Sequence, residues 1–150
     1  MSILEDLEDL VIAHIKANVA SIKTCRKYQG DFDEESLTKL RGLFPCALVL
    51  YGGGSFIRRN KTLTGSRGLT IFLGAKDLRG TDKSRMGTYE IIEDITEALD
   101  HETFGEYILD LASESLVYHD KSMTICAQEY KYELKGRTSS RQYSSFIPIR

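Results

Sequence analysis

The stretch ALVLYGGGSFIRRNKTLTGSRGLTIFLGA, residues 47–75, decides the fold. It begins with Ala47 to Tyr51, which are apolar at every position and therefore predict a strand buried on both faces in the middle of a sheet. It ends with Leu69 to Ala75, whose side chains alternate at the strand period and predict a second central strand. We expect the two to form a hairpin with a long arm, in which the glycines 52–54 mark a bulge or bend.

The sequence on either side of this hairpin predicts helices and further strands. Ser2 and Glu5 form a capping box, which indicates an amphipathic helix from Ile3 to Ile15 with Leu10 in its apolar stripe. Thr88 is expected to cap a second amphipathic helix, whose apolar positions are Tyr89, Ile92, Ile95 and Leu99. The remaining predicted elements are a short strand in 21–28, a helix between Asp33 and Phe44 that ends before Pro45, and an antiparallel pair over 107–118 and 123–134.

These elements predict an α+β fold in the order α-β-α-β-β-α-β-β, with a mostly antiparallel sheet packed by helices. The 150 residues, 41 % hydrophobic and 28 % charged, suit one globular domain, which we expect to span 1–135. Residues 136–150 are small, polar and basic, and predict a flexible tail. The longest apolar run, 47–51, is too short to cross a membrane. The acidic start lacks the features of a secretory signal, so a cytoplasmic protein is expected.

The sequence offers little for catalysis, cofactors or metals. Gly52 to Gly54 follow a strand, but they lack the lysine and hydroxyl of a Walker loop and the helix of a dinucleotide loop. Ser55 stands outside a G-x-S-x-G motif, and the adjacent His119 and Asp120 fit a turn between strands. The three cysteines form no C-x-x-C pair; Cys46 and Cys126 fit core positions better than reactive thiols. We expect no enzyme activity, no cofactor and no metal site.

Charge is distributed in blocks along the chain. Residues 46–87 hold 8 basic and 2 acidic residues, whereas 88–135 hold 3 basic and 12 acidic ones. This pattern predicts a basic side and an acidic side, suited to docking on copies of the same chain or to holding the basic side toward nucleic acid. The basic candidates are Arg58, Arg59, Lys61, Arg79, Lys83 and Arg85; the acidic candidates, on the helix 88–99, are Glu90, Glu93, Asp94 and Glu97. Ordinary solvated loop charge is the alternative for the basic group.

Several motifs in a fixed order resemble the Mu-like prophage proteins of the tail gene cluster. They are the amphipathic N-terminal helix, Phe44-Pro45, ALVLY with Gly53-Gly54 and Phe56, FLGAKDLRG at 72–80, and GTYEIIED at 87–94. The likeness covers residues 3 to 135. It implies a tail-terminator-like fold and a structural role in tail assembly, as a terminator or tail-completion (head-tail joining) subunit. It supplies no catalytic residues.

Proteins of that type form rings, commonly sixfold, that cap the tail tube and face the head connector. The resemblance therefore implies that the partners are copies of the chain, tail-tube protein and head-connector protein, with non-specific DNA contact in the channel. The location would be the bacterial cytoplasm and then the virion tail. In one arrangement the acidic helix meets a neighbour's basic hairpin; in the other, which we expect, the six basic residues line the channel. The alternative function is a small prophage nucleic-acid-binding or regulatory module that uses the same basic residues.

Overall fold

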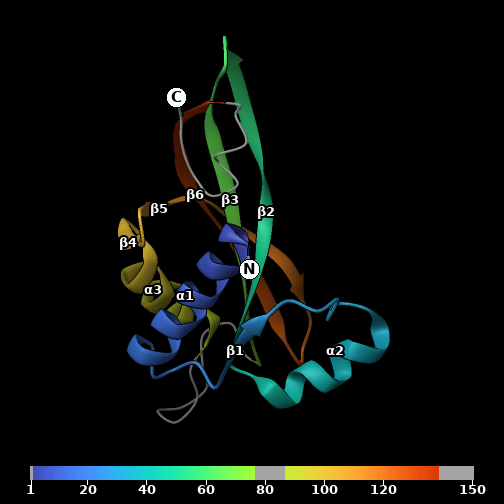
Figure 1. The fold of residues 1–150 in the computed structure, drawn as a ribbon. Helices are drawn as coiled ribbons and strands as arrows, with labels where there is room; N and C mark the ends of the chain where they lie inside the picture. The colour runs from blue at the N-terminus through green and yellow to red at the C-terminus, as the bar shows by residue number, and fades with distance from the viewer. Residues whose placement is uncertain (1, 77–86, 139–150) are drawn as a thin grey trace.

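One curled sheet of six strands, in the order β1-β2-β3-β6-β5-β4, organises the molecule (Figure 1). The computed structural model describes residues 2–76 and 87–138. Strand β1 runs parallel to β2, and the other four pairings are antiparallel. The elements are α1 (Ile3–Asn18), β1 (Thr24–Lys27), α2 (Glu34–Leu40), η1 (Arg41–Leu43), β2 (Cys46–Arg59), β3 (Thr62–Ala75), α3 (Thr88–Leu99), β4 (Glu102–Phe104), β5 (Tyr107–His119) and β6 (Thr124–Thr138).

The α+β class and the central hairpin are confirmed, but the predicted element order is incomplete. It lacks the 3₁₀ turn η1 and the strand β4, which pairs with the start of β5 around a turn at Gly105. A three-residue strand is too short to show a hydrophobic period, so it left no signal in the sequence. Strand β6 also continues to Thr138, beyond the predicted domain end at residue 135. Residues 139–150 of the predicted tail lie outside the described part of the chain.

The helices cover opposite faces of the sheet. Helices α1 and α3 pack on one face, where Val11, Ile15, Ile91 and Ile95 meet the sheet through Ile71 and its neighbours. Helix α2 packs on the other face in a smaller cluster that includes Leu40, Phe44, Leu48 and Ile125. Each such buried aliphatic side chain stabilises the fold by about 1.5–3 kcal/mol, so the helix-covered part of the sheet is the stable centre of the molecule.

Ser2 is confirmed as the N-cap of α1, because its hydroxyl accepts a hydrogen bond of 3.0 Å from the Glu5 amide. The Glu5 carboxylate accepts from the Ser2 hydroxyl at 3.3 Å, in place of the Ser2 amide that a capping box uses. Two details of the helix predictions are wrong. Leu10 was assigned to the buried stripe, yet it is 47 % exposed. Thr88 is the first residue of α3 and is buried; the cap position is Gly87. The rotation that buries Thr88 also buries Ile91 and leaves Tyr89 47 % exposed, so the predicted apolar stripe was off by one residue, roughly a quarter of a turn, at its start.

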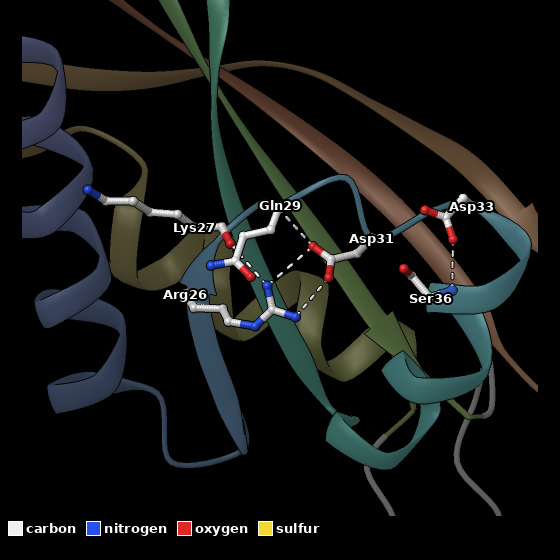
Figure 2. Close-up of polar contacts among 6 residues, drawn as sticks. All are labelled: Arg26, Lys27, Gln29, Asp31, Asp33 and Ser36. Carbon is white, nitrogen blue, oxygen red and sulfur yellow. Dashed lines mark hydrogen bonds and ion pairs between the residues drawn. The ribbon is translucent and has the colours of Figure 1, made fainter.

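A polar clamp orients α2 relative to β1 (Figure 2). The Arg26 guanidinium reaches across the turn to the Asp31 carboxylate, which also accepts a hydrogen bond of 2.9 Å from the Gln29 amide. Two residues later, the Asp33 carboxylate accepts a bond of 2.8 Å from the Ser36 amide and caps α2. The turn therefore directs α2 onto the face opposite α1.

Candidate assembly interface

The outer half of the β2–β3 hairpin, residues 52–68, extends beyond the part of the sheet that the helices cover (Figure 1). We call this segment the arm. Strand β1 pairs with β2 only as far as Val49, so in the described residues the outer edge of β2 from Gly52 onward has no neighbouring strand. On its inner side the arm is supported by β6, which pairs with β3 as far as Thr62.

The glycines at the base of the arm form a bulge, as the sequence predicts. The β2–β3 register shifts between Tyr51 and Gly53, and Gly53 has φ +92°, a left-handed conformation that glycine adopts without strain. The glycines border a polar hollow of about 210 Å³ in which the carboxylate residue Glu129 also lies. The glycines continue as strand β2 instead of opening a helix, so the arrangement lacks the helix N-terminus of a phosphate loop.

Three of the predicted basic residues lie together at the tip of the arm. Arg58 and Arg59 end β2, and Lys61 follows Asn60 in the two-residue turn; all three side chains are exposed. None forms an ion pair with another described residue. Arg79, Lys83 and Arg85 lie outside the described residues, so the predicted union of both basic groups into one edge stays a prediction.

A fourth cation of the arm, Arg67, is half-buried and stacks on an aromatic ring. Its guanidinium carbon lies 5.6 Å from the centroid of Phe56, while its Nε atom is buried without a hydrogen-bond partner in the described structure. Burial raises the pKa of the nearby Tyr132 to about 12, and the Arg67 charge opposes that rise. Arginine stacked on an aromatic ring is a side-chain pair that protein interfaces favour.

The predicted acidic face of α3 is largely confirmed as a surface. Glu90, Glu93 and Glu97 are exposed. Asp94 is half-buried instead, because its carboxylate accepts a hydrogen bond of 3.0 Å from the Ser21 hydroxyl and ties α3 to the segment between α1 and β1. The acidic helix and the arm tip belong to different parts of the fold; because Arg79, Lys83 and Arg85 lie outside the described residues, the separation of a basic side from an acidic side stays a prediction.

Two exposed apolar surfaces were not predicted from the sequence. Ile3, Leu10, Phe104 and Tyr107 line a groove of about 300 Å³ between α1 and the β4–β5 turn. At the far end of β5, the consecutive residues 116–118 are 59, 45 and 40 % exposed. Their apolar run resembles a core strand, but β4 pairs with β5 only over 107–109, so within the described residues this end of β5 lies at the edge of the sheet. The exposure of 116–118 follows from the sheet order, which the sequence pattern does not contain.

His119, Asp120 and the cysteines make contacts within the fold. His119 pairs with the Thr124 hydroxyl at 2.7 Å, whereas Asp120 accepts hydrogen bonds from Tyr118 and Ser122; the two are therefore not a dyad. The predicted core cysteines Cys46 and Cys126 are buried, as is Cys25, and burial raises the thiol pKa of Cys25 to about 11 and of Cys46 to about 12.

No cluster of metal-ligating side chains was found within residues 2–76 and 87–138. Across the same residues, no helix combines the length and apolarity needed to cross a membrane. The chain matches no protein-family model and no curated protein.

Proposed function

We propose that this protein is a subunit of a ring that completes or terminates a phage tail, and that it acts through contacts between polypeptides. The observation that carries this proposal is the arm. Strands of 14 residues extend past the helices and expose Phe56 at 42 % and Ile57 at 60 %, next to three cations. A narrow sheet that extends beyond its helices has little stability of its own and gains burial when a partner covers it.

The separation of charge supports association between copies. A ring requires two different, complementary patches on each subunit, because each copy contacts one neighbour with one patch and the other neighbour with the second. The exposed basic tip of the arm and the exposed acidic face of α3 satisfy that requirement in sign. The resemblance to tail-cluster proteins points to the same role, with a ring that is commonly sixfold.

A tube-capping assay tests this function. The protein is mixed with polymerised tail-tube protein of the phage or prophage that carries it, and is then examined by co-sedimentation and negative-stain microscopy. We expect co-sedimentation and a cap at one end of each tube. A variant carrying Arg58→Glu, Arg59→Glu and Lys61→Glu separates contact between subunits from DNA contact: if the tip lines the channel, caps still form but DNA no longer passes normally.

The exposed cations at the arm tip also favour a second candidate, a small nucleic-acid-binding module. Hairpin tips with several arginines fit phosphate backbones, and such binding weakens steeply with salt. A monomer that binds DNA tightly at physiological salt and leaves tail tubes uncapped would support this candidate and contradict the ring.

A further inference from the structure

We propose that copies of this protein join by strand addition. The outer edge of β2 in the arm, residues 52–59, pairs with the outer edge of β5, residues 112–119, of the next copy, so that the sheet continues from one copy to the next. This inference rests on the proposed function in one respect, since it takes copies to associate; it adds which strands make the contact.

Both edges offer unpaired backbone groups. The last residue of β2 that pairs with β1 is Val49. The last residue of β5 that pairs with β4 is Leu109. The next amide that points away from β6, that of Leu111, donates a hydrogen bond of 2.8 Å to the Asp100 carboxylate. Beyond these points neither edge has a partner strand within the described residues. Open edges of this kind are templates for strand addition, and each spans eight residues, or about 26 Å.

Both edges also carry apolar side chains that are exposed to solvent. In the arm these are Phe56 and Ile57, 42 and 60 % exposed; on β5 they are residues 116–118, the most exposed of which is Leu116 at 59 %. On each edge the apolar residues are consecutive in sequence, so their side chains point alternately to the two faces of the strand. Pairing would bury apolar surface above and below the joined sheet.

Charge selects the pairing of unlike edges. Residues 52–59 include Arg58 and Arg59 and no acidic residue, whereas 112–119 include Glu114 and no lysine or arginine. Two arm edges carry charge of the same sign, whereas the arm edge and the β5 edge carry charge of opposite sign, so charge favours pairing of the unlike edges. Contact between unlike edges is head-to-tail, which is the interface type that closes into rings.

Cross-linking at the centres of the two edges tests the contact directly. Ser55 and Ser115 are exposed and lie midway along each edge, so they are near each other whether the strands pair parallel or antiparallel. The variants Ser55→Cys and Ser115→Cys are mixed and treated with a short bismaleimide. We expect a covalent dimer from the mixture and little from either variant alone. The native cysteines are buried, and a mixture of Ser55→Cys with Thr38→Cys, on the exposed face of α2, is the matched control.

Charge reversal gives a second measurement. The double variant Arg58→Glu/Arg59→Glu should weaken self-association, measured by sedimentation velocity, by about tenfold or more. The double variant Lys16→Glu/Lys39→Glu makes the same change in net charge on the exposed sides of α1 and α2, and should leave self-association within about twofold of wild type. Equal effects of the two double variants would show that net charge, and not the arm edge, governs association.

The outcomes separate this inference from the proposed function. Association without a 55–115 cross-link overturns strand addition and leaves the ring to the tube-capping assay. Strand addition is also overturned if the protein does not self-associate up to about 1 mM, because the binding free energy between copies would then be weaker than about 4 kcal/mol. A specific cross-link between copies that never cap a tube supports strand addition and contradicts the tail function.

Discussion

Arg26 and Asp31 form a two-pronged ion pair that holds the start of the α2 segment against β1. Nη2 of Arg26 donates to Oδ1 of Asp31 at 2.8 Å, and Nη1 donates to Oδ2 at 3.2 Å. The Asp31 side chain is only 10 % exposed. A buried carboxylate with this geometry is stable only while its donors remain, so the pair determines where the chain turns toward α2.

Removing the carboxylate should therefore destabilise the fold substantially. We expect Asp31→Ala to lower the free energy of unfolding by about 2–3 kcal/mol, because the half-buried guanidinium loses its partner. Urea unfolding followed by circular dichroism measures the change. The matched control is Asp9→Ala, which breaks the pair with Lys27 at 3.2 Å; Asp9 is 53 % exposed, so the expected loss is below about 1 kcal/mol. Similar losses in both variants would contradict a special role for Asp31.

The ion pair between Arg26 and Asp31 also makes the free energy of unfolding depend on pH. Burial alone would raise the pKa of Asp31, but the hydrogen bonds from Arg26 and from the Gln29 amide outweigh it and hold the pKa below 3.8. A carboxyl whose pKa is lowered by folding stabilises the protein above its unfolded pKa, and that stabilisation disappears as the pH falls through the folded value. The stability difference between wild type and Asp31→Asn should thus be constant from pH 7 to 5 and shrink below pH 3.8. A difference that persists unchanged at pH 2 contradicts this.

A buried side-chain amide, that of Gln128, connects α3 to the sheet. We expect its contribution to the free energy of unfolding to be coupled to that of Tyr130. The Gln128 side chain is fully buried; its Nε2 donates to the Thr96 hydroxyl at 2.8 Å, and its Oε1 accepts from the Tyr130 hydroxyl at 2.8 Å. We expect Gln128→Leu to cost about 1–3 kcal/mol, chiefly because the buried Tyr130 hydroxyl loses its acceptor.

A double-mutant cycle isolates that cause. Gln128→Leu combined with Tyr130→Phe removes both the acceptor and the donor, so the double variant should lose at least about 0.5 kcal/mol less than the two single variants together. Thermal and urea unfolding of the four proteins give the coupling. Additive losses would show that the two side chains act independently.

The shape of the arm depends on a glycine in β3. Gly65 has φ +155°, lies where the β3–β6 register shifts, and leaves no room for a Cβ atom beside the Ser55 carbonyl oxygen. Gly65→Ala should force the hairpin apart, at a local cost of about 1–3 kcal/mol, and speed hydrogen exchange of the arm amides. Gly42→Ala is the control, because a Cβ there meets nothing within 4 Å. Unchanged exchange in the arm of Gly65→Ala would contradict the close contact.

The sequence predicts the centre of this fold better than its margins. The hairpin contains one continuous apolar run and one alternating run, a polar turn joins the two strands of the β5–β6 pair, and the caps of α1 and α2 follow from Ser2 and Asp33, so local chemistry is enough to find them. The short strand β4 and the exposure of Leu10 depend on which elements lie nearby, and no local pattern records that.

The same distinction holds for the candidate interface. The exposed tip cations Arg58, Arg59 and Lys61 were predictable because charged residues at a turn face water. The stacking of Arg67 on Phe56 depends on the register of two strands, and the exposure of the apolar end of β5 depends on which elements lie beside it. Both are properties of the assembled sheet, and a single sequence does not reveal them.

The position of β6 in the sheet has a consequence for synthesis. Strand β3 lies between β2 and β6, yet its second partner follows some fifty residues after β3 ends. At ribosomal rates of about 5–20 residues per second, the nascent hairpin waits several seconds with β3 unpaired on that side. During that interval the edge of β3 that later pairs with β6 is an open strand edge that a second nascent chain can join, so delayed synthesis of β6 exposes the chain to aggregation.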